Sequence, residues 1–270
     1  MGPVVQEVWE MVAELAPPVL AESWDNTGLQ IGDPGAEVRR VMLALDITPG
    51  LVKAALSSDV QMVVTHHPVI FHPLENFLFS SPVPRLVMPF LEHGIAVASA
   101  HTNLDAVAGG VNDVLADIAG MTEREPVIPA SGNFPGAGIG RIGHLARPVA
   151  ASDFLEKLCA DLQVKDIRVA GNIGKDVFRV AVCSGSGSGI WPHVIDRKPD
   201  IFITGEVKHN IAVEADLLDI IVADAGHWAT EHPVIPALAH RIRNMAADRG
   251  WQLETVVFAS ESDPFNMISF

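Results

Sequence analysis

A chain of 270 residues, of which 49% are hydrophobic, is long enough for one large α/β domain or two smaller domains, each with its own core. The formal net charge of −15, with no run or stripe among the 18 basic residues, excludes nucleic acid as the main partner. No apolar run reaches the roughly 18 residues that a membrane-spanning helix needs, so no membrane partner is expected.

The N-terminal segment and the cysteines indicate the compartment. Residues 1–15 contain Glu7, Glu10 and Glu14, whereas a signal peptide begins with basic residues and continues with apolar ones. Cys159 and Cys183 are too few for a disulfide framework. We therefore expect a cytoplasmic protein.

The first half of the chain alternates between helical and strand patterns. Apolar residues at helical spacing predict a helix over 5–15, which Pro17 and Pro18 end. Strands are predicted at 40–46, 60–65 and 95–100, and helices after the cap Thr48, over 82–93 and from Val111. This alternation predicts parallel strands in a three-layer α/β architecture.

The second half resumes the alternation after a glycine-rich stretch at 131–145 that reads as a loop leading into a strand. An amphipathic helix is predicted over 151–162, and strands are predicted at 178–183, 200–205, 219–226 and 251–259.

Three segments are expected from these patterns. The first α/β domain spans 1–127 and carries His66, His67 and Asp105, and a middle α/β domain spans 128–195. A C-terminal segment, 196–270, returns to the first domain and supplies His227 and Glu231.

Two adjacent histidines, His66 and His67, follow the predicted strand 60–65. The carboxyl end of a parallel strand is where α/β proteins bind ligands. Neighbouring side chains of a strand point to opposite faces, so both rings reach one centre only if the strand breaks there, which Pro68 favours. For an isolated pair, the alternative of one core histidine and one surface histidine would be preferred.

Two further strand ends carry ligand-type residues. His101 and Asp105 follow the strand 95–100, although Asp105 alone also suits a helix cap or an Asx turn. His227 and Glu231 follow the strand 219–226 and are four residues apart, so they share one helix face. His and carboxylate ligands at three strand ends predict a divalent-metal site, and five ligands predict two ions about 3.5–4 Å apart.

Several motifs together resemble the GTP cyclohydrolase 1 type 2 family, also called Nif-three-like or YbgI-like. The motifs are DNTGLQIGD (25–33), VTHHPVIF (64–71), HTNLDA (101–106), ITGEVKHN (203–210), GHWATE (226–231) and SDPF (262–265). The resemblance implies two similar three-layer α/β/α domains, with the metal site at strand carboxyl ends in the cleft. It also implies a ring-shaped homohexamer and two divalent ions per chain, whose ligands are His66, His67, Asp105, His227 and Glu231.

The resemblance implies an activity. In the reaction that names the family, water adds at C8 of GTP, the ring opens and formate leaves on the way to dihydroneopterin triphosphate. We expect His101, His209 and Glu206 to orient ligands or carry protons in catalysis. A small-molecule substrate of the nucleotide type is expected, and the metals could be zinc, iron, manganese or nickel.

Other readings stay open. The same ligands suit a dinuclear-metal hydrolase of a phosphoester or a cyclic amide, or a metal-binding regulator or scaffold without turnover. Arg141 resembles a family motif and is a candidate substrate-binding residue for a phosphate, but a structural salt bridge is equally compatible. The stretch 183–190 reads as a flexible turn, Cys183 as a buried apolar residue and Trp24 as a packing residue.

Overall fold

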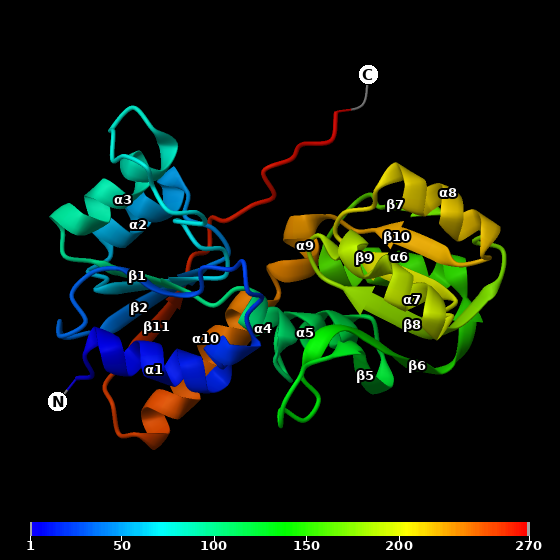
Figure 1. The fold of residues 1–270 in the computed structure, drawn as a ribbon, viewed down its shortest axis with the longest axis horizontal. Helices are drawn as coiled ribbons and strands as arrows, with labels where there is room; N and C mark the ends of the chain where they lie inside the picture. Colours follow the sequence, from blue (N-terminus) through cyan, green and yellow to red (C-terminus); the bar gives the residue numbers. More distant parts are fainter. Residues whose placement is uncertain (1, 269–270) are drawn as a thin grey trace. The chain divides into compact units, whose positions relative to one another are not determined.

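The computed structural model describes residues 2–268, which form two compact units (Figure 1). Unit 1 extends to Leu104 and resumes over Val234–Ser262, whereas unit 2 takes Asp105–Pro233 and the residues from Asp263 onward. None of the helices in the described part of the chain is both long enough and apolar enough to cross a lipid bilayer.

Unit 1 is built on a five-stranded sheet with the order β1-β4-β3-β2-β11. Its strands are β1 (Gly28–Ile31), β2 (Arg40–Ala44), β3 (Met62–Thr65), β4 (Ala96–Ser99) and β11 (Glu254–Val257). All neighbouring pairs are parallel except β1 with β4. The parallel strands β3 and β4 are buried along their whole length, which explains why they read as continuous apolar runs.

Helices cover both faces of this sheet (Figure 1). The helices are α1 (Val5–Leu15), α2 (Pro49–Ser57), α3 (Pro82–Glu92) and α10 (Val234–Asp248), with a 3-10 turn, η1, at Pro18–Leu20. Helices α2 and α3 pack their apolar residues against β2, β3 and β4 on one face. On the other face α10 packs against β2 and β11, and α1 packs against α10. Unit 1 is therefore a three-layer α/β/α unit, as predicted.

Unit 2 has a six-stranded sheet with the order β5-β6-β8-β9-β10-β7. Its strands are β5 (Thr122–Pro129), β6 (Gly138–Ala150), β7 (Arg168–Ala170), β8 (Asp176–Cys183), β9 (Ile201–Thr204) and β10 (Ile221–Asp224). The central strands β8, β9 and β10 are parallel, and β5, β6 and β7 pair antiparallel at the two sides.

Helices again occupy both faces in unit 2. They are α5 (Val111–Ile118), α6 (Ala151–Leu162), α7 (Trp191–Arg197), α8 (His209–Leu217) and the short α9 (His227–Glu231), with a 3-10 turn, η2, at Gly187–Ile190. Helices α5 and α6 share one apolar core with the sheet, and α7 and α8 share the other. The short helix α4 (Thr102–Ala106) spans the boundary between the units. The predicted fold class of two three-layer units is confirmed.

The unit boundaries differ from the predicted segments. The expected boundary at 127 falls inside β5, whose antiparallel partner is β6. Strands β9 and β10 continue the sheet of β8, so the return to unit 1 begins at Val234 and not at residue 196. Asp105 consequently belongs to unit 2, together with His227 and Glu231.

Candidate metal centre

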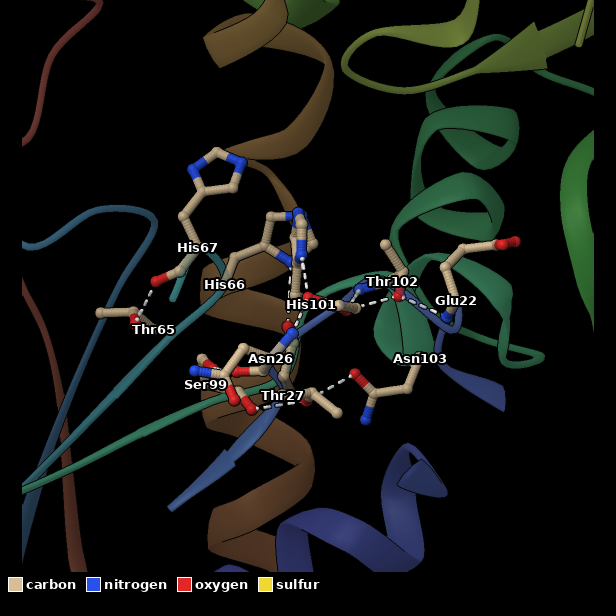
Figure 2. A network of polar contacts seen from close by, with 12 residues as sticks. Glu22, Asn26, Thr27, Thr65, His66, His67, Ser99, His101, Thr102 and Asn103 are labelled. Carbon is tan, nitrogen blue, oxygen red and sulfur yellow. Dashed lines mark hydrogen bonds and ion pairs between the residues drawn. The ribbon is translucent and has the colours of Figure 1, made fainter. Parts of the chain in front are cut away.

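Three histidines gather at the carboxyl edge of the unit 1 sheet (Figure 2). His66 and His67 follow β3, and His101 follows β4. One ring nitrogen from each lies within 4.8 Å of the others, a spacing that could hold a metal ion. We call His66, His67 and His101 the histidine cluster.

The adjacent rings of His66 and His67 lie on the same side of the chain because the strand ends between them and Thr65. The Thr65 hydroxyl donates a hydrogen bond of 2.7 Å to the carbonyl of His67, and the backbone bends at His66 and His67 (Figure 2). The two ring centroids are 4.9 Å apart. The regular alternation of side chains is lost here, which is the break that the prediction required.

Each ring of the histidine cluster has its Nδ1 atom hydrogen-bonded to an oxygen. The partners are the carbonyl of Ala100 for His66 at 3.0 Å, Asp46 Oδ1 for His67 at 2.8 Å and Asp25 Oδ1 for His101 at 2.8 Å. A carbonyl or carboxylate oxygen accepts, so Nδ1 carries the proton and Nε2 carries the lone pair. This is the tautomer in which metal-binding histidines are held.

Asp25 is the most tightly held of these oxygen partners. Its side chain is fully buried and accepts hydrogen bonds from the Thr102 amide at 3.0 Å and the Thr102 hydroxyl at 2.5 Å, besides the one from His101. Burial raises the pKa of Asp25, but these hydrogen bonds and the charge of His101 outweigh it and lower the pKa to about 2. Asp25 is therefore ionised at neutral pH and fixes the orientation of the His101 ring.

Asp46 is held in turn by Glu261. The Glu261 carboxylate accepts hydrogen bonds from the backbone amides of Leu45 at 2.8 Å and Asp46 at 2.9 Å. Burial raises the pKa of Glu261, although those amide hydrogen bonds oppose the shift. The ends of β2, β3, β4 and β11 thus all contribute to the surroundings of the histidine cluster.

A second group of ligand-type residues lies within unit 2. His227 and Glu231 are the first and last residues of α9, and His227 Nε2 is 3.0 Å from Glu231 Oε2. Two ligand atoms that are each about 2.1 Å from one ion lie roughly 3 to 3.5 Å apart, so this spacing suits a shared ion. A carboxylate oxygen of Asp105 lies within 4.8 Å of one of Glu231. We call Asp105, His227 and Glu231 the carboxylate cluster.

His227 repeats the arrangement of the histidine cluster. Its Nδ1 atom is 2.7 Å from Glu206 Oε1, so the proton again sits on Nδ1. Glu206 follows β9 and is exposed. The structure therefore places Glu206 as an orienting partner of His227.

The glycine-rich loop after β8 packs closely on the carboxylate cluster. A Cβ atom at Gly185 would lie 2.0 Å from Glu231 Oε1 and 3.1 Å from His227 Nε2, and the φ angle of this residue is +56°. The loop continues into η2 and is largely buried, whereas its sequence reads as a flexible turn. Gly185 lets the backbone approach the side chains of Glu231 and His227, which fits a site for a small cation.

Cys183 is a buried neutral thiol at the end of β8. Burial raises its pKa, and the negative charges of Asp105 and Glu231 raise the pKa further. A thiol held in this form is a poor nucleophile. The interpretation of Cys183 as a buried apolar residue is consistent with this environment.

Arg141 is placed as a structural residue. Its side chain is 1% exposed and forms two hydrogen bonds of 2.9 Å with the Asp113 carboxylate. It also donates to the carbonyls of Gly138 and Gly140 at 2.7 and 2.8 Å. These contacts favour the salt-bridge alternative over the substrate-binding role.

Two other predicted residues lie on the surface. His209 begins α8 and is exposed. Trp24 is 55% exposed, so the expectation that it is a packing residue is wrong.

Sequence reasoning missed three acidic residues of the site, namely Asp25, Asp46 and Glu261. Asp25 opens the motif DNTGLQIGD, and Asp46 ends the predicted strand 40–46, so both positions carried a signal. Glu261 lies in a segment with no strand or helix pattern, where sequence alone gives no reason to select it.

Comparisons with known proteins identify the family of this chain. The model of the Duf34/NIF3 (NGG1p interacting factor 3) family matches residues 3–264. The chain belongs to the Duf34/NIF3 family. A Duf34/NIF3 relative from Streptomyces coelicolor, named GTP cyclohydrolase 1 type 2 homolog, is 32% identical over 97% of this chain and 94% of its own length.

Two solved structures show the same fold. A Bacillus cereus protein related to NIF3 aligns with a TM-score of 0.93 at 22% identity and covers 99% of this chain and all of its own. Reduced HcgD from Methanocaldococcus jannaschii aligns with a TM-score of 0.78 at 28% identity, covering 96% of this chain and 99% of its own.

Proposed function

We propose that this protein is a hydrolase that depends on two divalent metal ions per chain. The ligands are His66 and His67 of the histidine cluster and all three residues of the carboxylate cluster. The observation that carries the proposal is that His66, His67 and His227 each have Nδ1 bound to an oxygen, so each offers Nε2 as a ligand.

The donor set fits borderline divalent ions. Imidazole nitrogens and carboxylate oxygens suit zinc, iron, manganese or nickel. Such ions would supply Lewis acidity and an acidified water near neutral pH. Glu231 would hold metal through its carboxylate, and Gly185 leaves the space that the carboxylate oxygens require.

The residues of the chain itself supply proton transfer. Asp25 fixes the His101 ring with the proton on Nδ1, and its charge stabilises the imidazolium that forms when Nε2 takes a proton. His101 is therefore the residue that we propose removes a proton from the attacking water and returns it to the leaving group. Glu206 holds His227 in the same manner.

The substrate that we propose is GTP, hydrolysed at C8 with release of formate. The support is the family membership and the names of relatives such as the GTP cyclohydrolase 1 type 2 homolog from Streptomyces coelicolor. A ring-shaped homohexamer, which the sequence resemblance leads us to expect, is the assembly that we propose. A dinuclear-metal hydrolase of a phosphoester or a cyclic amide uses the same ligands and is separated from the first proposal by product analysis.

The first test is the metal content of the purified protein and of Glu231→Ala, measured by mass spectrometry without chelator. We expect about two transition-metal ions per chain in the parent protein and fewer in the variant. Glu156→Ala, which changes an exposed carboxylate on α6, is the control and should keep the parent's metal content. Metal-free protein that stays metal-free after supplementation would contradict the proposal.

The second test identifies the reaction. Metal-loaded protein is incubated with GTP and, separately, with p-nitrophenyl phosphate, and formate, pterin and nitrophenol are measured. Formate release that depends on the metal and is lost in His101→Ala supports the cyclohydrolase. Nitrophenol without formate supports a phosphoesterase, and no turnover of either compound favours a metal-binding regulator or scaffold.

A further inference from the structure

Two exposed aromatic side chains stand beside the histidine cluster in unit 1. The Trp24 ring lies 6.1 Å from the His101 ring and the Phe71 ring lies 6.0 Å from it, both in edge-to-face geometry. Trp24 is 55% exposed and Phe71 is 38% exposed. Single exposed aromatic residues are common on protein surfaces. Here two aromatic side chains contact each other and a candidate catalytic ring, and together they form a continuous aromatic surface.

Both aromatic residues are held by rigid neighbours. Trp24 precedes Asp25, whose buried carboxylate is bound to His101 and Thr102. This anchor fixes the backbone from which the indole projects. A side chain with few accessible positions loses little conformational entropy when a ligand binds.

Phe71 is anchored in a similar way through Ile70. The Gln30 side chain accepts a hydrogen bond from the Ile70 amide and donates one to the Ile70 carbonyl, each at 3.1 Å. The side-chain amide of Asn26 donates a second hydrogen bond to the same carbonyl at 2.5 Å. The loop after β3 is thereby fixed to the β1 segment.

The geometry of the pair selects the way a ligand can bind. The Trp24 and Phe71 centroids are 5.8 Å apart with 39° between the planes. Stacked rings are themselves at least about 4.5 Å apart, so a third ring cannot enter between them and must stack on the outer faces. Every planar heteroaromatic ring has a π-face that can stack in this manner.

We propose that Trp24 and Phe71 form a stacking platform for a purine base, which places the ring of the substrate next to His101. This inference rests on the proposed function, because a nucleotide substrate supplies the base.

The experiment compares two probes that differ only in the base, namely GMP and ribose 5-phosphate. Binding is measured by titration calorimetry to zinc-loaded protein and to chelator-treated protein. The parent protein should bind GMP more tightly than ribose 5-phosphate in both forms. Trp24→Ala should weaken GMP binding roughly 5- to 100-fold and leave ribose 5-phosphate binding unchanged.

Two further variants keep the result interpretable. Trp24→Phe retains a stacking face and should restore most of the GMP affinity, which a purely structural role of the indole would not predict. Trp251→Ala removes a tryptophan of unit 1 that packs under Arg249 and should leave GMP binding unchanged. Thermal melting confirms that each variant is folded.

The outcomes separate this platform from the proposed function. Equal binding of GMP to the parent protein and Trp24→Ala, or an equal loss for both probes, overturns the platform even when the metal content is intact. A change of oligomeric state in Trp24→Ala on light scattering, without a change in GMP affinity, overturns it in favour of a contact with a second copy. If the protein holds no metal but binds GMP more tightly than ribose 5-phosphate, and this preference is lost in Trp24→Ala, the platform is supported and the proposed hydrolase is contradicted.

Discussion

At the scale of single residues, backbone space decides whether the carboxylate cluster can form. Only glycine at position 185 allows the loop after β8 to lie against Glu231. A Cβ atom at this position would lie 2.0 Å from Glu231 Oε1 and would overlap it. The left-handed φ of +56° adds strain for a residue with a side chain. The function of this glycine is therefore to admit a ligand side chain and not to make the loop flexible.

Gly185→Ala should lower metal affinity by about tenfold or more, since the new methyl group displaces Glu231 from its position. Affinity is measured by competition with a chromogenic chelator. Gly189→Ala is the matched control in the same loop, because a Cβ at Gly189 meets nothing within 4 Å. Equal metal affinity in the two variants would show that Glu231 is not a ligand.

The Arg141–Asp113 pair predicts how unit 2 responds to acid. Burial raises the pKa of Asp113, but the hydrogen bonds and charge of Arg141 outweigh it, and the pKa is lowered. A carboxylate with a lowered folded-state pKa stabilises the protein above its unfolded pKa of roughly 3.9, and this stability is lost as the pH falls through the folded value.

Asp113→Asn should lower the free energy of unfolding at pH 7 by about 3–5 kcal/mol, because Arg141 then stays buried without its counter-charge. The loss of stability on acidification below about pH 4 should become shallower in the variant. Urea unfolding over a pH series measures both. Lys157→Ala, which breaks an exposed ion pair with Asp161, should cost less than about 1 kcal/mol.

At the scale of elements, the start of α2 shows how a local signal sets a boundary. The Thr48 hydroxyl accepts a hydrogen bond from the Leu51 amide at 3.1 Å, and Pro49 occupies the first turn. This cap was predicted from sequence because it depends only on neighbouring residues. Strand β5 was not predicted, because it begins with four consecutive polar residues and contains two prolines, and it gains its order from the long pairing with β6.

Thr48→Ala should lower the free energy of unfolding of unit 1 by about 1 kcal/mol, since one amide of the first turn loses its acceptor. Thr48→Ser should keep most of the stability because it retains the hydroxyl. Ser57→Ala at the exposed end of the same helix is the control, and it should change little. Denaturant midpoints that are equal for Thr48→Ala and Ser57→Ala would contradict the role of the cap.

At the scale of the whole molecule, the two units have separate cores. The chain leaves unit 1 at Leu104 and returns at Val234. It then forms α10 and β11, and β11 pairs with β2 to complete a sheet begun some 200 residues earlier. Separate cores predict separate cooperative unfolding.

Calorimetry of chelator-treated protein should therefore resolve two transitions. Thr48→Ala should shift only the transition of unit 1, and Asp113→Asn should shift only that of unit 2. A single transition that both variants shift by comparable amounts would mean that the units unfold as one body.

The sequence alone determined the alternation of helices and strands, the cap at Thr48 and five candidate ligands at strand ends, because hydrophobic periodicity and short motifs are local properties. The tertiary structure alone decided three other matters. It assigned β9 and β10 to the second sheet, it buried Arg141 against Asp113, and it brought Asp25, Asp46 and Glu261 to the histidines. These contacts join residues that are far apart in the chain, and their partners are fixed by sheet order and packing, which no local pattern encodes.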